Sequence, residues 1–207
     1  MSHPKIKICG LTRWSDVKFA ADKGVDFLGF ILAPNSPRCI DIDRAKQFVA
    51  KLDIMYPDVG SVAVVVRKDL MEIDHIIKSV DPDYIQVHND MKANDFNKID
   101  FENKIKVLRV NGPLELSNLS DYKAKYFLFD TYVKGQSGGT GKTFDWQWIP
   151  KEILCKSFIS GGIDLNNMTT IIKDISPFAI DMNSGLETEP GIKSHTAIVK
   201  AVDKLLV

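Results

Sequence analysis

Two side chains in this sequence are of types that move protons, and each stands at the end of a short apolar run. Cys9 closes the run that starts at Lys5, and Asp130 closes the run that starts at Tyr126. A thiolate can act as a base if a neighbouring positive charge or dipole lowers the thiol pKa from about 8.5. A carboxyl group that apolar neighbours partly shield can donate a proton near neutral pH, because shielding raises its pKa. The pair therefore predicts acid-base chemistry.

Each of these residues also has an ordinary structural interpretation. A buried cysteine often serves as a small packing residue, and an aspartate after a strand can cap the following loop. The position of Cys9 at a strand end favours chemistry over packing. Cys39 and Cys155 have no comparable position, and we interpret both as packing residues.

Glycines after two later runs predict a phosphate site. Gly161 and Gly162 follow the run Ser157 to Ser160, and Asn183, Ser184 and Gly185 follow the run Phe178 to Met182. Backbone N–H groups there are unobstructed, and a short helix starting at such a point adds its positive end. One such glycine pair alone would be interpreted as the end of a strand. Two neighbouring strand ends together favour phosphate.

A third glycine-rich segment, GQSGGTGK, occupies positions 135–142 and includes Gly139, Thr140 and Gly141. It has one residue too many for the phosphate-binding GxxxxGK pattern of nucleotide sites. Glycines permit the hinge motion that a lid requires, so we expect this loop to fold over a phosphorylated substrate and exclude water.

Three more polar residues lie at or just after the ends of predicted strands, and we expect them near the same site. Arg38 follows Pro37, which stiffens the loop and directs the guanidinium to grip a carboxylate through two hydrogen bonds. His88 and Asp181 at strand ends are compatible with a divalent metal. No second imidazole is positioned to complete such a site, because the other histidines lie in the N-terminal tail or in or beside helices (His3, His75 and His195). We therefore expect His88 to contact substrate and no metal to be bound.

These residues require an α/β scaffold in which many strand ends meet. Near-continuous apolar runs alternate with amphipathic segments, a pattern typical of parallel strands joined by helices. The predicted strands are Lys5 to Cys9, Phe27 to Leu32, Ser61 to Val66, Tyr84 to Val87, Ile105 to Val110, Tyr126 to Asp130, Ser157 to Ser160 and Phe178 to Met182. The predicted helices are Trp14 to Lys23, Ile42 to Leu52, Leu70 to Val80, Asn166 to Lys173 and Thr196 to Leu206.

Eight such units in 207 residues predict a (β/α)8 TIM barrel of small size, formed by residues 1–207 as one domain. The helices after the fourth and fifth strands are weakly predicted, because 91–98 is polar and 114–122 is short. A dinucleotide-binding sheet is disfavoured, since no GxGxxG follows the first strand. In a barrel of this kind the working residues stand at the carboxyl ends of the strands.

The charge balance and the composition of the chain exclude some classes of binding partner. Twenty-seven basic residues balance twenty-seven acidic ones, so neither nucleic acid nor an anionic membrane surface is expected as a partner. Apolar runs are too short to cross a bilayer, and no signal-peptide core precedes the first strand. Three cysteines without CxxC spacing suit a reducing compartment. We expect a cytoplasmic protein, a monomer because no unbalanced apolar helix face stands out, acting on a small molecule.

With these motifs the chain resembles the phosphoribosylanthranilate isomerase family from Lys5 to about Lys200. The resemblance rests on KICGLT at 7–12, GF at 29–30, SPR at 36–38, QVH at 86–88, DT at 130–131, GGTGKTFDW at 138–146, SGG at 160–162, NSGLE at 183–187 and PGIK at 190–193, in the family's order. It implies an Amadori rearrangement in tryptophan biosynthesis that needs no cofactor. The family's general acid corresponds to Asp130 and its general base to Cys9.

The resemblance also implies that Arg38 holds the anthranilate carboxylate and that Gly161, Gly162, Ser184 and Gly185 hold the phosphate, with 139–141 closing above. Two stretches depart from the family's usual pattern: Asn89-Asp90, where glycine usually follows the histidine, and Met182-Asn183 in place of Val-Ser. Two alternatives remain open. One is a related phosphosugar barrel enzyme, such as a metal-dependent ribulose-phosphate epimerase or the histidine-pathway isomerase, and the other is a catalytically idle barrel that only binds a phosphorylated metabolite.

Overall fold

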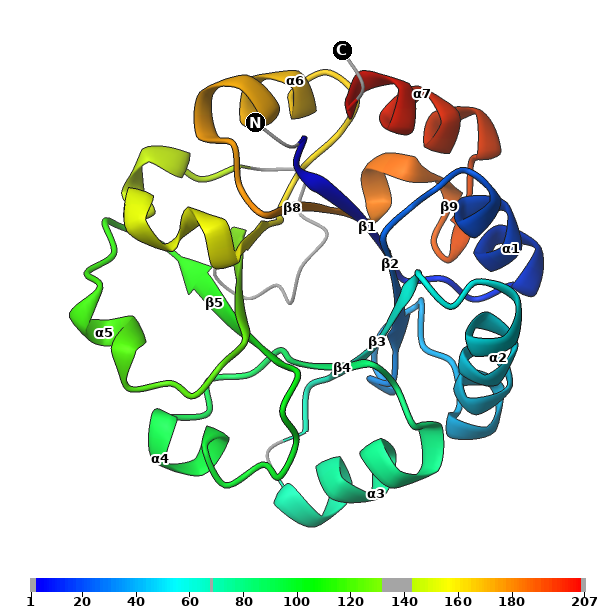
Figure 1. The fold of residues 1–207 in the computed structure, drawn as a ribbon, viewed down its shortest axis with the longest axis horizontal. Helices are drawn as coiled ribbons and strands as arrows, with labels where there is room; N and C mark the ends of the chain where they lie inside the picture. The colour runs from blue at the N-terminus through cyan, green and yellow to red at the C-terminus, as the bar shows by residue number, and fades with distance from the viewer. Residues whose placement is uncertain (1–2, 68, 132–142, 206–207) are drawn as a thin grey trace.

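The computed structural model describes residues 3–67, 69–131 and 143–205, and its centre is a closed barrel of eight parallel strands (Figure 1). The strands pair in chain order, and β8 closes the ring by pairing with β1. Their bounds are β1 Lys5–Cys9, β2 Phe27–Ile31, β3 Gly60–Val65, β4 Tyr84–Val87, β5 Lys104–Val110, β6 Tyr126–Thr131, β7 Ser157–Ile159 and β8 Ala179–Met182. The predicted (β/α)8 barrel is confirmed.

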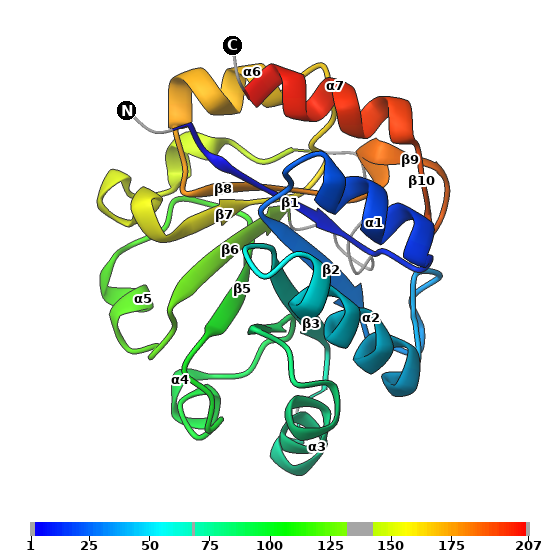
Figure 2. The same cartoon turned by 45° about the vertical axis from the view of Figure 1, so that its right-hand side comes forward.

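Helices surround the barrel, but unevenly (Figure 1). The longer ones are α1 Trp14–Asp22, α2 Ile42–Met55, α3 Leu70–Val80 and α7 His195–Leu205. Figure 2 shows α1 and α2 on the outside of β1 and β2, with α7 beside α1. The connections after the fourth to seventh strands are α4 Ala93–Phe96, α5 Ser117–Ser120, the 3₁₀ turns η1 Trp146–Trp148 and η2 Lys151–Lys156, α6 Met168–Thr170 and the π-turn η3 Ile171–Ile175.

Side-chain caps explain where two of the longer helices begin. The Asp41 carboxylate accepts a hydrogen bond from the Arg44 N–H at 2.7 Å, and Asp69 accepts from Met71 and Glu72 at the start of α3. These caps satisfy backbone donors that have no partner within the helix. The weakly predicted helices after β4 and β5 are four residues each, as their polar or short sequences indicated.

The strands are buried on both faces, which explains their continuous apolar character. Their outer faces pack under the helices in a large core. Their inner faces form a separate cluster that includes Phe27, Val64, Val107, Leu128 and Phe158. Stacked and edge-on rings fill the end of the barrel where the strands begin, with Tyr126 and Phe178 stacked at 4.4 Å between centroids. The barrel is therefore solid at that end, and only its carboxyl end is left to hold a ligand.

Element boundaries differ from the predictions by a few residues. Leu32, Val66, Ser160 and Phe178 were predicted as strand ends and lie just outside the strands. The helix expected from 166 begins at 168, because the Asp164 carboxylate accepts hydrogen bonds from the N–H groups of the next two asparagines and holds them in a turn. The predicted end of α2 at Leu52 is three residues short, and Leu206 lies outside the described residues.

A small hairpin that the sequence analysis did not predict follows β8. The 3₁₀ turn η4 Ser184–Leu186 leads into β9 Glu187–Glu189, which pairs antiparallel with β10 Ile192–Lys193. It lies at the carboxyl end of the barrel beside α1 (Figure 2). Among the described residues, none of the helices has the length and apolarity needed to cross a membrane.

Candidate active site

The carboxyl ends of the strands surround a cavity of about 670 Å³. It brings together most of the residues predicted from sequence, namely Cys9, Arg38, His88, Asp130, Gly161, Gly162, Asp181, Asn183 and Ser184. Gly185 follows directly in the chain. Gly139, Thr140 and Gly141 lie outside the described residues, and the closing of their loop over a substrate stays a prediction.

Cys9 ends β1 with its thiol on the inner face of the barrel, and the residue is only 4% exposed. Its neighbour across the β1–β2 pair is Gly29, and a Cβ there would come within 2.8 Å of the Cys9 sulfur. Glycine at this position therefore makes the space that the thiol occupies. Burial raises the pKa of the Cys9 thiol, and the charges of Lys7 and Lys193 oppose this only in part. The condition named for a cysteine base, a lowered thiol pKa, is not met in this structure, because burial outweighs the two cations.

Lys7 lies two residues before Cys9 on the same inner face and is fully buried. Its ammonium donates a hydrogen bond of 2.8 Å to the carboxylate of Asp181, its register partner on β8. Burial acts to lower the pKa of Lys7, but attraction to Asp181 and to the Cys9 sulfur outweighs it and raises the pKa. A lysine in its charged form thus stands beneath the thiol.

Asp130 is the penultimate residue of β6 and is 6% exposed. One carboxyl oxygen accepts a hydrogen bond from the Thr131 N–H at 2.8 Å, so this carboxyl group does fasten the next residue, as the alternative interpretation held. Burial nevertheless raises the pKa of Asp130 to about 6. Gly161, at φ +87°, passes so close that a Cβ would lie 2.8 Å from the same oxygen. Asp130 is therefore both anchored and protonatable near neutral pH.

Arg109 lies beside Asp130 on the adjacent strand β5, and His88 approaches Asp130 from the end of β4, one strand further away. The His88 ring nitrogen Nε2 is 3.6 Å from the second Asp130 oxygen, beyond hydrogen-bond distance, and has no hydrogen-bond partner among the described residues. Burial, and then the positive charge of Arg109, lowers the pKa of His88 to about 4. The buried Oε1 of Gln86, on the same inner face of β4, is likewise without a partner in the described part of the chain. Neutral His88 and Gln86 are thus available to a polar ligand.

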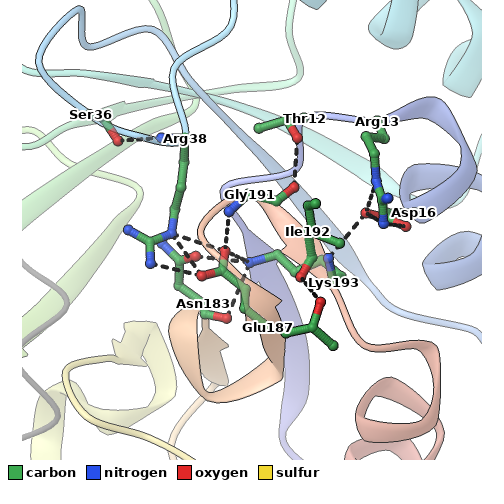
Figure 3. A network of polar contacts seen from close by, with 11 residues as sticks. Thr12, Arg13, Asp16, Ser36, Arg38, Asn183, Glu187, Gly191, Ile192 and Lys193 are labelled. Atoms are coloured by element: carbon green, nitrogen blue, oxygen red, sulfur yellow. Dashed lines mark hydrogen bonds and ion pairs between the residues drawn. The ribbon is translucent and has the colours of Figure 1, made fainter.

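Arg38 reaches the cavity from the loop after β2, but one edge of its guanidinium is already occupied (Figure 3). Its Nε and Nη2 donate hydrogen bonds of 2.7 to 3.0 Å to the Glu187 carboxylate on the hairpin. Nη1 has no hydrogen bond to any described residue. The edge formed by Nη1 and Nη2 can therefore still bind a second carboxylate. Arginine commonly binds a carboxylate in this way, through two parallel hydrogen bonds.

Lys193 holds the other side of Glu187 (Figure 3). Its fully buried ammonium donates to Glu187 at 2.8 Å and to the backbone and side-chain oxygens of Asn183 at 3.1 and 2.9 Å. Burial acts to raise the pKa of Glu187, but Arg38 and Lys193 outweigh it and the pKa is lowered. The hairpin is thereby tied to the end of β8 and to the loop that carries Arg38.

The predicted phosphate site has the expected backbone. Gly161 and Gly162 adopt φ angles of +87° and +65°, and η4 begins at Ser184 on the neighbouring strand end. The N–H groups of Gly161, Gly162, Ser184 and Gly185 form no hydrogen bond with any described residue. Unengaged amides at two adjacent strand ends are what an oxyanion requires. Among residues 3–67, 69–131 and 143–205, no cluster of three or more His, Cys, Asp or Glu side chains could hold a metal ion.

A family model described as N-(5'-phosphoribosyl)anthranilate (PRA) isomerase matches residues 6–204. The chain belongs to this family. It is 35% identical over 201 residues to the isomerase of Pseudomonas paraeruginosa, with 96% of this chain and 93% of the relative covered. It is 36% identical over 204 residues to that of Petrotoga mobilis, with 97% and 96% covered.

Solved structures of phosphoribosylanthranilate isomerases have the same fold. The enzyme from Thermus thermophilus has a TM-score of 0.85 and 27% identity, with 98% of both chains covered. A phosphoribosyl anthranilate isomerase in complex with reduced 1-(o-carboxyphenylamino)-1-deoxyribulose 5-phosphate has a TM-score of 0.81 and 25% identity, again over 98% of both chains.

Both departures from the isomerase family's usual sequence have structural partners here. The Asn89 side chain donates to the Arg67 carbonyl and accepts from the Met91 N–H at 2.8 Å, so it fastens the loop after β4. Met182 is buried in the core, and Asn183 receives the Lys193 ammonium. The cysteines differ from expectation. Cys155 is exposed, so its interpretation as a packing residue is wrong, and Cys39 is half-buried.

Sequence reasoning assigned no role to Lys7, Arg109, Glu187 or Lys193. The first two were detectable, because side chains alternate along a strand. If Cys9 faces inward then so does Lys7, and Arg109 shares its face of β5 with the inward-facing Val107. Glu187 and Lys193 belong to the hairpin, whose short strands gave no periodic signal.

Proposed function

We propose that this chain catalyses the Amadori rearrangement of N-(5-phosphoribosyl)anthranilate to 1-(2-carboxyphenylamino)-1-deoxyribulose 5-phosphate in tryptophan biosynthesis. One observation carries the proposal: a buried thiol and a carboxyl group protonatable near neutral pH line the same cavity, on strands separated by β7 and β8. The reaction delivers one proton and removes another at different atoms, so it needs two such groups held apart. Family membership supports the same reaction.

In the first step Asp130 protonates the oxygen of the ribose ring, which then opens to a Schiff base. A pKa of about 6 keeps an appreciable fraction of this carboxyl group protonated near neutral pH, while the group remains acidic enough to give up its proton. The Thr131 N–H stabilises the carboxylate that results. Arg109, whose positive charge acts on Asp130, favours the same ionised product.

In the second step the thiolate of Cys9 removes the proton from C2 of the sugar, giving an enolamine that tautomerises to the ketone. Over one turnover a proton leaves Asp130 and a proton arrives at Cys9, and exchange with solvent restores both. The space left by Gly29 and the inward position of the thiol suit this role.

The two anionic ends of the substrate have matching groups in the cavity. The free edge of Arg38 would bind the anthranilate carboxylate, and the amides of Gly161, Gly162, Ser184 and Gly185 would bind the phosphate. Asp181, His88 and Asn183 line the same cavity and would contact the rest of the substrate. The loop that includes Gly139, Thr140 and Gly141 would close above the phosphate.

A fluorescence assay that follows the loss of phosphoribosylanthranilate with purified protein tests this function. We expect turnover by the unmodified chain, and a loss of turnover by orders of magnitude in Cys9→Ala and in Asp130→Asn with the fold retained. No turnover by the unmodified chain would refute the proposed reaction. Near-normal turnover in either variant would remove that residue from its role.

Assembly and location are separate proposals. We propose a monomer located in the cytoplasm. A phosphoribosylanthranilate isomerase of Thermotoga maritima is described as dimeric, which makes the assembly worth measuring. Sedimentation at micromolar concentration should give the mass of one chain, 23.2 kDa. A mass twice as large would overturn the monomer, and recovery of the protein outside the cytoplasmic fraction would overturn the location.

A further inference from the structure

A charged side chain lies where a barrel of this kind normally holds an apolar one. Lys7 is fully buried on the inner face of β1, in the layer directly beneath Cys9. Barrel interiors are filled mainly by branched apolar side chains, and a buried ammonium is costly unless it is paired. The lysine therefore needs an explanation beyond packing.

Part of the explanation is the ion pair with Asp181. The two residues are register partners on β1 and β8, and their side chains meet at 2.8 Å with 0% and 5% exposure. This pair satisfies the charge of Lys7. It does not account for the presence of the charge, because a well-packed apolar pair at such a site is usually as stable as a buried ion pair.

Among the groups that the Lys7 ammonium acts on, the Cys9 thiol lies two residues further along the same inner face of β1. Of the described residues, the charged groups that act most strongly on the thiol are Lys7 from the same strand, Asp181 from β8 and Lys193 from β10. Lys7 is the strongest of the three, and it favours the thiolate, as Lys193 does, whereas Asp181 disfavours it. Lys193 is in turn shared with Glu187 and lies close to the charge of Arg38.

We propose that Lys7 is a positioning residue of the active site whose buried ammonium, oriented by Asp181, is the counter-charge of the Cys9 thiolate. The inference rests on the proposed function for the role of Cys9 as a base. The thiol loses its proton to solvent and the thiolate is then held beside Lys7, which stays protonated throughout. When the thiolate takes the C2 proton of the substrate it becomes neutral, and Lys7 retains Asp181 as its anion. Lys7 thus has an anionic partner in both states.

The test is the alkylation of Cys9 by iodoacetamide as a function of pH, followed by mass spectrometry of the Cys9 peptide. Only the thiolate reacts, so the midpoint of the profile reports the pKa of the thiol. Two variants should shift the profile in opposite directions. In Lys7→Met the counter-charge is gone, and we expect alkylation at pH 7.5 to slow at least tenfold. In Asp181→Asn an opposing anion is gone, and we expect alkylation to speed up several-fold with a midpoint at lower pH.

Matched controls are present in the same chain. Lys5→Met, on the same strand, removes a lysine that pairs with Asp26 at the opposite end of the barrel, and it should leave the Cys9 profile unchanged. Cys39 and Cys155 should react at the same rate in every variant. Circular dichroism before the reaction establishes that each variant is folded.

The outcomes separate this proposal from the proposed function, because alkylation requires no substrate. An unchanged Cys9 profile in Lys7→Met, or slower alkylation in both Lys7→Met and Asp181→Asn, would overturn the counter-charge role. If Lys7→Met does not fold, Asp181→Asn decides: a midpoint that stays in place or rises contradicts the proposal. If the unmodified chain alkylates as expected but does not turn over phosphoribosylanthranilate, the proposed function fails and the pairing of Lys7 with Cys9 stands.

Discussion

The two sides of the cavity are built in different ways. On the side of β1, β8 and the hairpin, the buried and partly buried charged groups form ion pairs: Lys7 with Asp181, and Arg38 and Lys193 with Glu187. On the side of β4, β5 and β6, Asp130 has one hydrogen bond among the residues that the structure describes, to a backbone N–H, and lies 3.6 Å from a histidine ring. Burial is the main cause of the pKa shifts on that side: it raises the pKa of Asp130 and lowers that of His88.

This difference matches what the two proposed catalytic groups must do. A base that is used as an anion needs fixed positive charge near it, which the first side supplies. An acid that is used in its neutral form needs only to be shielded from water, which the second side supplies. The loose contacts around Asp130 also leave polar atoms of Gln86 and His88 available to a substrate.

The largest effect should come from removing the acid. Asp130→Asn keeps an acceptor for the Thr131 N–H but has no proton of suitable acidity, so we expect turnover to fall by about 10² to 10⁴ with KM nearly unchanged. Steady-state fluorescence measures both. Asp90→Asn, at the exposed rim of the same cavity, is the control and should cost less than about tenfold. An equal loss of turnover in the two variants would mean that Asp130 acts only through its negative charge, as any carboxylate near the cavity would.

Removing the anion shared by Arg38 and Lys193 should lower the stability of the fold. Glu187→Gln leaves the buried Lys193 ammonium and the Arg38 guanidinium without their shared anion, and we expect the free energy of unfolding to fall by about 3 kcal/mol. Urea unfolding followed by circular dichroism measures it. Glu189→Gln, exposed on the same hairpin, should change stability by less than about 0.5 kcal/mol. A similarly small change for Glu187→Gln would show that the ion pairs of Glu187 do not contribute to the free energy of unfolding.

Burial of Asp130 should make the free energy of unfolding fall as pH rises. The pKa of Asp130 in the folded protein is about 6, above its ordinary value of 3.8, so the folded state binds more protons than the unfolded state between these pH values. The ionised carboxylate therefore costs stability as pH rises through this window. Asp130→Asn should be more stable than the unmodified chain by on the order of 2 kcal/mol at pH 8, and nearly equal to it at pH 4. A stability difference that does not change with pH would contradict the shielding.

The smallest effect concerns the close approach of Gly161 to the acid. Gly161→Ala brings a Cβ to 2.3 Å from the Thr131 hydroxyl and 2.8 Å from Asp130, in a backbone conformation with φ +87°. Gly24→Ala has a similar φ of +79° and open space around its Cβ, so it isolates the backbone strain. Gly24→Ala should lose about 1 kcal/mol of stability. Gly161→Ala should lose more, because its Cβ also clashes with Thr131, and only Gly161→Ala should lower turnover, by about tenfold. Equal turnover in the two variants would show that Asp130 tolerates displacement.

Much of this arrangement could be predicted from the sequence, because strand ends in a barrel converge and local signals mark them. Continuous apolar runs gave the strands, and Cys9, Asp130 and the glycine pair at 161–162 were identified by standing at the ends of these runs. The raised pKa of Asp130 followed from its apolar neighbours in the strand.

The partners of these groups could not be predicted in the same way, because they come from distant parts of the chain. Glu187 is 149 residues from Arg38, and Asp181 is 174 residues from Lys7. Only the closure of the barrel brings them together. The direction of the Cys9 pKa shift could not be predicted either, because the degree of burial of a thiol depends on the whole interior of the barrel and not on its own strand.

The division of labour between Cys9 and Asp130 is tested most directly by the isotope effect of deuterium at C2 of the ribose ring. In Cys9→Ser, removal of the C2 proton should become the slowest step, and turnover should show a large primary isotope effect. In Asp130→Asn, ring opening should limit the rate, and the effect should be close to unity. The same isotope effect in both variants, or the reverse pattern, would contradict the assignment of base and acid to the two sides of the cavity.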